Sequence, residues 1–172
     1  MIKKKFNMKK IYFPMLVTIF LATSCQMKTK TAPFDPVAAK AEVTKTLDSL
    51  DTALKSKDAK TFLSFYAEDG LYCGTDPTEL WDKAAFSKEI TTMMADTGNF
   101  SDMTVTKREI LIDNSGNSAN VLRQFVTKWS KPIEVRSTMH LVKTGNDWKI
   151  NFASLALVPV NKDLPKLTAV AK

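Results

Sequence analysis

The sequence predicts an α+β domain in which three helices come first and a long antiparallel sheet follows. Apolar residues recur at helical spacing in the first half of the chain, and from residue 104 the pattern changes to β-branched, alternating strands. Short connections rich in turn-forming residues join these strands, which is typical of a meander of hairpins. The chain has 172 residues, enough for one domain to bury a sizeable core without metals or disulfides.

The first predicted helix begins at Asp35-Pro36, because aspartate is a good N-cap and proline is tolerated at the first helical position. Its apolar residues recur at four- and three-residue spacing and share one face: Val43, Leu47, Leu50 and Leu54. Asp58 caps a second, short helix that ends at Gly70. The buried side of this second helix is expected to carry Ala59, Phe62, Leu63 and Tyr66.

A short strand is expected over residues 71–74, before a turn at Asp76-Pro77. A third helix follows Trp81-Asp82 and closes near Gly98. Its apolar stripe consists of Phe86, Ile90, Met93 and Met94. The four long strands are expected over residues 104–112, 119–129, 133–143 and 148–158.

The N-terminal segment has the composition of an export signal. Five lysines precede an apolar run over residues 11–22, and small residues then lead to Cys25. The segment also resembles a bacterial lipoprotein signal, in which cleavage occurs just before a cysteine that then carries lipid. An ordinary cleaved signal with an incidental cysteine is the alternative, whereas a transmembrane anchor would need about 20 apolar residues. We therefore expect an exported protein of the cell envelope, anchored to the membrane through lipid on Cys25.

This interpretation divides the chain into four parts. They are a signal over residues 1–24, a flexible tether over residues 25–34, the folded domain over residues 35–160 and a loose tail over residues 161–172. The tail is assigned because the periodicity there is weak.

Charge and cysteine content argue against several classes of function. The whole chain has a net charge of +7, but removal of residues 1–24 takes away five lysines and no acid, which leaves 20 basic against 18 acidic residues. Nucleic-acid binding is therefore not expected. Cys73 is the only cysteine after Cys25, so no internal disulfide is expected. The single histidine, His140, gives no metal signature, and we expect neither a metal nor a cofactor.

Several short strings carry a family resemblance. They are Phe65–Gly70 (Phe-Tyr-Ala-Glu-Asp-Gly), Gly74–Pro77 (Gly-Thr-Asp-Pro), Arg136–Thr138 (Arg-Ser-Thr) and Trp148–Ile150 (Trp-Lys-Ile). In this order, and with the order of the elements, the chain resembles SnoaL-like proteins of the nuclear transport factor 2-like superfamily over residues 37–158. The resemblance implies a cone-like fold, with the helices packed in a curved antiparallel sheet of about four long strands and one short strand. Proteins of that superfamily have an open-ended pocket, and they include isomerases, dehydratases, hydrolases and binding modules. The fold therefore does not settle the function.

The candidates for lining such a pocket are aromatic and cationic side chains. The aromatic candidates are Tyr66, Tyr72, Trp81, Phe125, Trp129 and Phe152, which would otherwise fill the core. Strand alternation puts Arg123, Phe125 and Trp129 on one face of their strand, and Arg136 and His140 on one face of the next. An arginine that faces the pocket would suit a carboxylate or another anionic ligand, whereas one that faces outward is a solvated charge.

Three functional hypotheses remain open at this stage. The first is a lipoprotein whose pocket binds a small, partly apolar ligand. An anionic ligand is included in this hypothesis. The second is an isomerase, dehydratase or hydrolase in which Asp76 acts as the base and Tyr72 or His140 assists, although Asp-Pro is also ordinary turn chemistry. The third is a structural module with a closed cavity, which pairs with a second copy through its sheet face.

Overall fold

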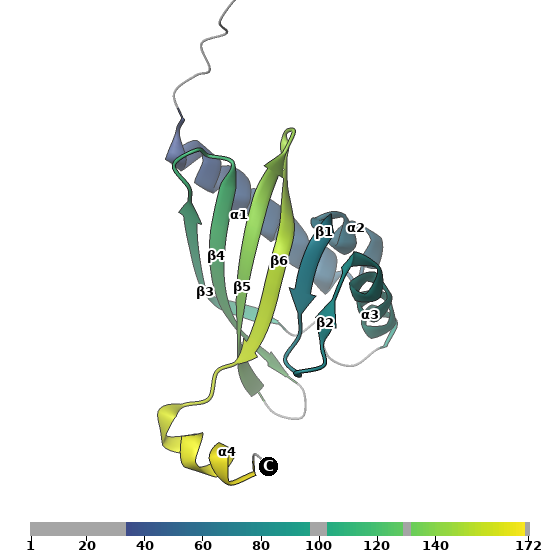
Figure 1. The fold of residues 1–172 in the computed structure, drawn as a ribbon, viewed down its shortest axis with the longest axis vertical. Coiled ribbons are helices and arrows are strands. Elements are labelled where there is room, and N and C mark those ends of the chain that lie inside the picture. The colour runs from purple at the N-terminus through teal and green to yellow at the C-terminus, as the bar shows by residue number, and fades with distance from the viewer. Residues whose placement is uncertain (1–33, 97–102, 129–131, 171–172) are drawn as a thin grey trace, which may run out of the picture. The chain divides into compact units, whose positions relative to one another are not determined.

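The computed structural model describes residues 34–96, 103–128 and 132–170 (Figure 1). The helices are α1 (Pro36–Lys55), α2 (Ala59–Ser64), α3 (Lys83–Ala95) and α4 (Leu164–Val170), with a 3-10 turn η1 (Asn161–Asp163) before α4. The strands are β1 (Tyr66–Cys73), β2 (Leu80–Trp81), β3 (Thr104–Ile112), β4 (Ser118–Lys128), β5 (Pro132–Thr144) and β6 (Asp147–Leu157). Residues 1–33, with the predicted signal and Cys25, lie outside the described part. Within that part, no helix has both the length and the apolarity needed to cross a bilayer.

The six strands form one sheet in the order β2-β1-β6-β5-β4-β3. Strands β3 to β6 are the predicted meander, joined by successive antiparallel pairings. The hairpin between β5 and β6 turns at Gly145, whose φ of 62° is a conformation that glycine adopts without strain. The prediction of an α+β domain with helices first and a hairpin-linked sheet second is confirmed.

The first strand differs from the sequence prediction in length and in direction. It begins at Tyr66 rather than at Leu71, because α2 ends early and the chain enters the sheet at once. The backbone carbonyl of Phe65 already accepts a 2.8 Å hydrogen bond from the amide of Ile150 on β6. Strand β1 then runs parallel to β6, a pairing that needs a long connection, which α3 and the four strands β2 to β5 supply here. The sheet is therefore mixed, with one parallel pair in an otherwise antiparallel order.

Helix α1 packs its apolar stripe against the inward face of the sheet, behind β3 to β6 in Figure 1. Asp35 caps it by accepting hydrogen bonds from the amides of Val37 and Ala38, as the sequence predicts. Its buried residues are Ala39, Val43, Leu47, Leu50 and Ala53. Helices α2 and α3 lie by β1 and β2.

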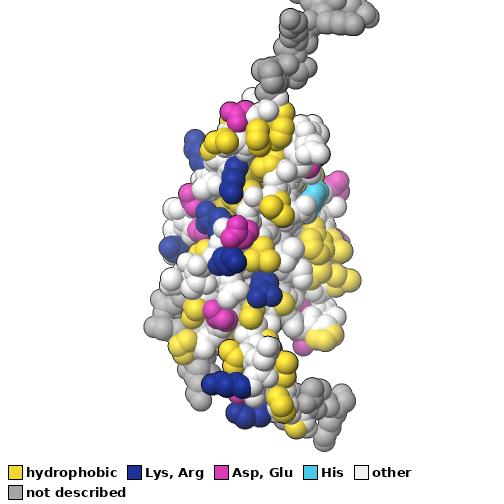
Figure 2. All heavy atoms as spheres, turned by 90° about the vertical axis from the view of Figure 1, so that its left-hand side faces the viewer, with side chains coloured by type: hydrophobic (Ala, Val, Ile, Leu, Met, Phe, Trp, Pro, Cys, Tyr) yellow, Lys and Arg dark blue, Asp and Glu magenta, His cyan; other side chains and the backbone are white. Residues whose placement is uncertain are grey.

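The outer surface is mixed in character. On the face shown in Figure 2, basic and acidic side chains are interspersed with hydrophobic ones, and no continuous basic area is visible.

The C-terminal tail, which the sequence predicts to be loose, is partly helical, since η1 and α4 follow β6. Weak apolar periodicity did not reveal this helix because a short exposed helix needs no apolar stripe.

Candidate ligand-binding cavity

A cavity of about 340 Å³ lies between the helices and the inward face of the sheet. Side chains of α1 and α3 line one side, and side chains of β1, β4, β5 and β6 line the other. Most of the lining is apolar or aromatic: Leu50, Leu54, Phe62, Tyr66, Tyr72, Trp81, Phe86, Ile90, Met93, Met94, Met103, Phe125, Val135, Met139, Ala153 and Leu155. A volume of this size and lining is that of a small-molecule site.

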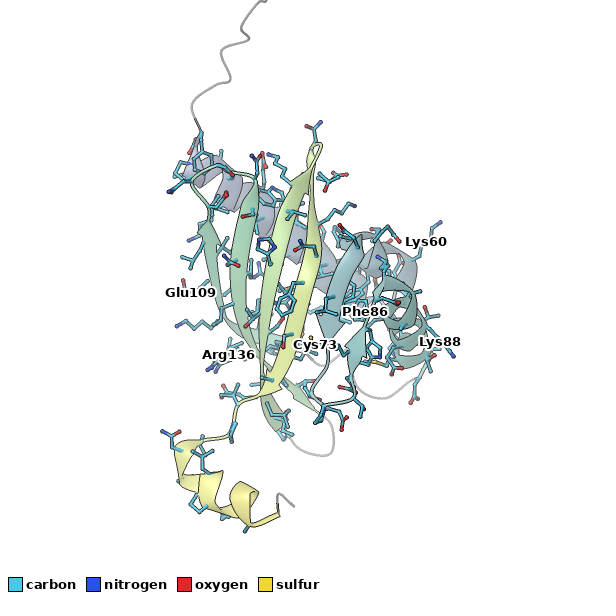
Figure 3. All side chains as sticks on the ribbon, in the orientation of Figure 1. Lys60, Cys73, Phe86, Lys88, Glu109 and Arg136 are labelled. Atoms are coloured by element: carbon cyan, nitrogen blue, oxygen red, sulfur yellow. The ribbon has the colours of Figure 1, made fainter. Side chains whose placement is uncertain are left out.

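An aromatic cluster forms the wall of the cavity between β1 and α3. The ring of Tyr66 lies 5.1 Å from that of Tyr72 and 4.8 Å from that of Phe86, centre to centre. Phe86, labelled in Figure 3 between β1 and α3, is also 4.5 Å from Tyr72 and 6.2 Å from Trp81. Tilted and edge-on ring pairs at these distances are favourable packing arrangements. The wall is therefore closely packed and mainly aromatic.

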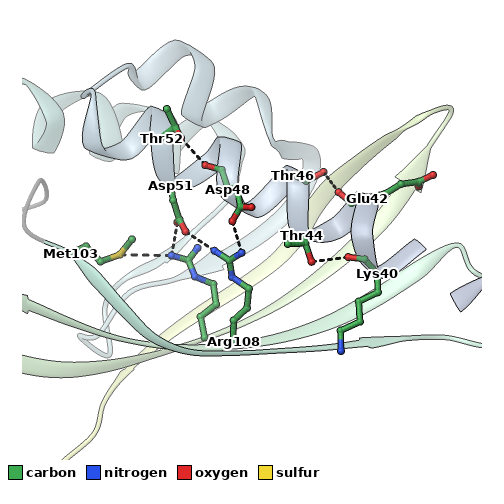
Figure 4. Close-up of polar contacts among 10 residues, drawn as sticks. Lys40, Glu42, Thr44, Thr46, Asp48, Asp51, Thr52, Met103 and Arg108 are labelled. Carbon is green, nitrogen blue, oxygen red and sulfur yellow. Dashed lines mark hydrogen bonds and ion pairs between the residues drawn. The ribbon is translucent and has the colours of Figure 1, made fainter. Parts of the chain in front are cut away.

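A buried ion pair crosses the opposite part of the lining (Figure 4). Arg123 Nη2 on β4 donates to Asp51 Oδ1 on α1 at 2.6 Å, and both side chains line the cavity. Arg108 Nη2 donates to the other oxygen, Asp51 Oδ2, at 2.8 Å, and Arg108 Nη1 donates to Asp48 Oδ1 at 2.6 Å. Two guanidinium groups thus meet two carboxylates, and the network has no net formal charge.

Arg123 is the most deeply buried charged side chain of the lining. It is 4 % exposed, and its Nε has no hydrogen-bond partner among the described residues. Burial lowers the pKa of Arg123, and the neighbouring Asp51 carboxylate opposes that shift. Ser137, its cross-strand neighbour on β5, and Thr127 on β4 are further buried polar residues of the lining.

The hydroxyl groups of the two cavity tyrosines are neutral. Burial raises the pKa of Tyr66 far above its usual value, with Arg123 opposing the shift. Burial also raises the pKa of Tyr72 to about 12. The Tyr72 hydroxyl donates to the carbonyl oxygens of Ala67 and Ile150, at 2.7 and 3.1 Å. The Tyr72 ring lines the cavity, but its hydroxyl proton is used in hydrogen bonds to the backbone of the sheet.

Two glutamates complete the charged lining. Glu79 follows the turn after β1, and its Oε2 accepts hydrogen bonds from the amides of Thr75 and Asp76 at 2.6 and 2.9 Å. Glu89 projects from α3, and both glutamates are half-buried. Within the described residues, no group of three or more His, Cys, Asp or Glu side chains is arranged to hold a metal ion.

The sequence profile of the SnoaL-like domain matches residues 43–159, which span α1 to β6 and hence the whole cavity. The chain belongs to the SnoaL-like domain family. No curated protein matches the chain.

Solved structures similar to this SnoaL-like domain share its fold at low sequence identity. An NTF2-like protein of unknown function from Pseudomonas putida is 16 % identical with a TM-score of 0.64, over 73 % of this chain and 89 % of that one. An uncharacterised protein with a cystatin-like fold from Caulobacter vibrioides is 13 % identical with a TM-score of 0.63, over 76 % and 99 % of the two chains. A ketosteroid isomerase-like protein from Erwinia carotovora is 15 % identical with a TM-score of 0.56, over 70 % and 96 %. These similarities establish the NTF2-like or cystatin-like fold. The function has to be inferred from the residues of the site.

Five of the candidate residues lie at the cavity of the SnoaL-like domain: Tyr66, Tyr72, Trp81, Arg123 and Phe125. Arg136, His140 and Phe152 lie on the other face of the sheet, which corrects the expectation that they line the pocket. Figure 3 shows Arg136 on the outer side of the strands, where it donates to Gln124 at 3.2 Å. His140 Nδ1 lies 2.6 Å from Asn151 Oδ1 on that outer face. Trp129 falls outside the described residues.

The proposed catalytic group does not assemble. Asp76 is exposed, does not line the cavity, and accepts hydrogen bonds from the amide and hydroxyl of Thr78 at 2.8 and 2.6 Å. Those hydrogen bonds lower the pKa of Asp76. It is therefore a turn-capping carboxylate, and neither Tyr72 nor His140 offers it a partner.

Asp51 and the sulfur atoms of the lining were not predicted as site groups from the sequence. Asp51 lies four residues after Leu47 and next to Leu50, so the helical period already places it at the edge of the buried stripe. The sulfur-bearing lining residues are Cys73, Met93, Met94, Met103 and Met139. Met103 lies with its Sδ 3.8 Å from Arg123 Nη2, a contact that no local pattern could predict.

Proposed function

We propose that this SnoaL-like domain is the folded part of a lipid-anchored envelope protein that binds one small, largely apolar molecule in its cavity. The single observation that carries the proposal is the cavity of about 340 Å³, whose aromatic wall faces a buried, internally neutralised ion pair. Flat apolar walls with a few fixed polar groups are what small-ligand sites need. The hypothesis of a closed cavity does not agree with this open volume.

The enzymatic alternative has weaker support. Asp76, Tyr72 and His140 do not meet. Of the three carboxylates in the lining, Asp51 has both oxygens held by guanidinium groups, Glu79 accepts two backbone hydrogen bonds, and Glu89 has no partner among the described residues that would orient it as a base. A general base needs a carboxylate oxygen within reach of the substrate proton. The binding function therefore accounts for the geometry without a reaction.

The binding proposal is tested with a neutral fluorescent probe, N-phenyl-1-naphthylamine, whose emission rises in apolar sites. Ala153→Leu adds bulk inside the cavity, because Ala153 is buried and lines it. Ala156→Leu is the matched control, since Ala156 is exposed and alternates to the outer face of β6. We expect the wild type and Ala156→Leu to bind the probe alike and Ala153→Leu to bind at least several-fold more weakly. Equal binding by all three proteins would contradict the proposal.

Lipid anchoring is tested in cells. Cys25→Ser should release the protein from the membrane fraction, because the thiol that carries the lipid is removed. Cys73→Ser is the control and should stay with the membrane. Membrane retention of Cys25→Ser would count against lipidation.

Self-association through the sheet is the second candidate property. Leu71 on the outer face is 44 % exposed and pairs in register with Phe152, which in turn lies opposite His140. An exposed apolar group beside a half-buried aromatic ring is a surface that a second copy would cover. We expect Phe152→Lys to shift a dimer to a monomer in light scattering, and a wild-type monomer at micromolar concentration would argue against this role.

A further inference from the structure

The charged side chains that line the cavity are unequal in number. Among the described residues they are three carboxylates, Asp51, Glu79 and Glu89, and one guanidinium, Arg123. Asp51 and Arg123 neutralise each other at 2.6 Å. The charges of the two glutamates are left over, so the arginine in the lining does not make the cavity attractive to anions.

Glu79 is held in place by the turn that it follows. Its carboxylate accepts two backbone hydrogen bonds, from Thr75 and Asp76, and neither donor carries a charge. The carboxylate is therefore fixed in position while its negative charge is retained. A carboxylate that is already fixed at the edge of an apolar site attracts a cationic ligand, and binding then costs no free energy for ordering the carboxylate.

Glu89 is in a different situation. It is half-buried on α3, lines the cavity, and makes no hydrogen bond or ion pair with the described residues. A carboxylate that is partly withdrawn from water and unpaired is unfavourable, and a cationic group brought beside it offsets that cost.

No lysine in the described part supplies the missing positive charge to the lining. Lys83 comes near, with its Nζ 5.9 Å from the ring centre of Tyr66. That ammonium donates to the carbonyl oxygens of Leu63 and Tyr66, at 2.5 and 2.8 Å, and Lys83 does not line the cavity.

The aromatic wall suits a cation as well. Trp81 is half-buried in the lining, with its ring 6.2 Å from that of Phe86. The faces of tryptophan and phenylalanine rings attract cations, most strongly where water is partly excluded.

Resting on the proposed binding function, we infer that the cavity selects an apolar molecule that bears a protonated amine and discriminates against carboxylates. The apolar body lies against the aromatic wall, and the ammonium group is attracted by Glu79 and Glu89. The ligand class is thus a hydrophobic amine, the opposite in charge to what an arginine-lined pocket would take.

Three probes of the same shape and different charge test the inference. They are 1-naphthylmethylamine, 1-naphthylmethanol and 1-naphthoate, titrated at pH 7 into the full-length Cys25→Ser chain by calorimetry. We expect the amine to bind roughly tenfold more tightly than the alcohol, and the alcohol more tightly than the carboxylate, since each half-exposed charge contributes up to about a factor of five. Added salt should narrow the gap between amine and alcohol.

Matched variants separate the two proposals. Glu89→Gln removes a cavity charge and should lower the affinity for the amine about three- to fivefold with the alcohol unchanged. Glu109→Gln removes the same charge from the exposed outer side of β3 and should change neither. If the alcohol binds but the amine is no better, or if Glu89→Gln leaves their ratio unaltered, the inference about charge is overturned and the binding function stands. If none of the probes binds, the binding function itself fails.

Discussion

Asp51 on α1 and Arg123 on β4 form an ion pair of 2.6 Å that joins the helical layer to the sheet at the wall of the cavity. The two side chains are 13 % and 5 % exposed, and Arg108 closes the network on the other oxygen of Asp51. A pair buried to this degree is costly to break, because the partner left behind keeps its charge without solvent. The network therefore fixes the distance between α1 and the sheet, and with it the width of the cavity.

Removal of this carboxylate should destabilise the fold strongly. Asp51→Ala removes the carboxylate that pairs with Arg123 and leaves Arg108 with Asp48, so we expect a loss of about 3–5 kcal/mol in the free energy of unfolding. Asp48→Ala is the control on the same helix and should cost less than about 1 kcal/mol, since its side chain is 63 % exposed. Urea denaturation measures both. Equal losses of unfolding free energy in the two variants would show that the buried ion pair contributes no more to stability than the exposed one.

A double replacement tests whether the cost comes from the unpaired charge. In Asp51→Leu with Arg123→Met, both buried charges are replaced by apolar groups. We expect the double variant to be more stable than Asp51→Ala, because apolar packing replaces buried ion pairs at little or no cost. A double variant no more stable than Asp51→Ala would show that the loss comes from packing.

Much of this architecture could be predicted from local patterns. The Asp35 cap, the stripe of α1 and the limits of β3 to β6 follow from capping, helical period and turn residues. Strand alternation also predicts which residues share a face. It does not predict which face is inward when both faces carry apolar groups, and so Arg123 and Arg136 could not be told apart.

Two parts of the site depend on contacts that are distant in the sequence. Tyr66 continues the helical spacing of α2, yet the parallel pairing with Ile150 on β6 draws it into a strand. The partner of Arg123 lies on α1, 72 residues earlier in the chain. Such partners are set by tertiary packing, which overrides a local propensity.

Tyr72→Phe separates a structural from a chemical role of the hydroxyl. The hydroxyl donates to two backbone carbonyls of the sheet, so its loss should reduce the free energy of unfolding by about 1–2 kcal/mol. The ring stays in the aromatic wall, so binding of N-phenyl-1-naphthylamine should be unchanged. Weaker probe binding with unaltered stability would instead indicate that the hydroxyl contacts the ligand.

Trp148→Ala should be among the most destabilising substitutions in the sheet. The side chain is 3 % exposed, packs in the main core, and donates from Nε1 to Glu42 Oε2 at 3.0 Å. We expect a loss of about 3–5 kcal/mol, the range for a large buried aromatic residue. Trp148→Phe keeps most of the bulk and should cost less. A loss within about 0.5 kcal/mol for Trp148→Ala would be typical of an exposed residue.

Glu42 links the same tryptophan to the acid stability of the fold. Hydrogen bonds from Lys143 and Trp148 lower the pKa of Glu42 below its ordinary value of 4.5. A carboxylate whose pKa is lower in the folded state contributes stability above the unfolded-state pKa, and this contribution is lost as the pH falls through the folded-state value. We therefore expect Glu42→Gln to be less stable than the wild type at pH 6, with a difference that shrinks as the pH is lowered from about 5 to 3. Urea denaturation across this range measures the difference.

Because Glu42 is half-exposed, added salt should reduce the stability difference between the wild type and Glu42→Gln at pH 6. A difference that stays constant with pH would mean that the ionised carboxylate, and with it the Lys143 and Trp148 contacts, plays no part in stabilising the fold.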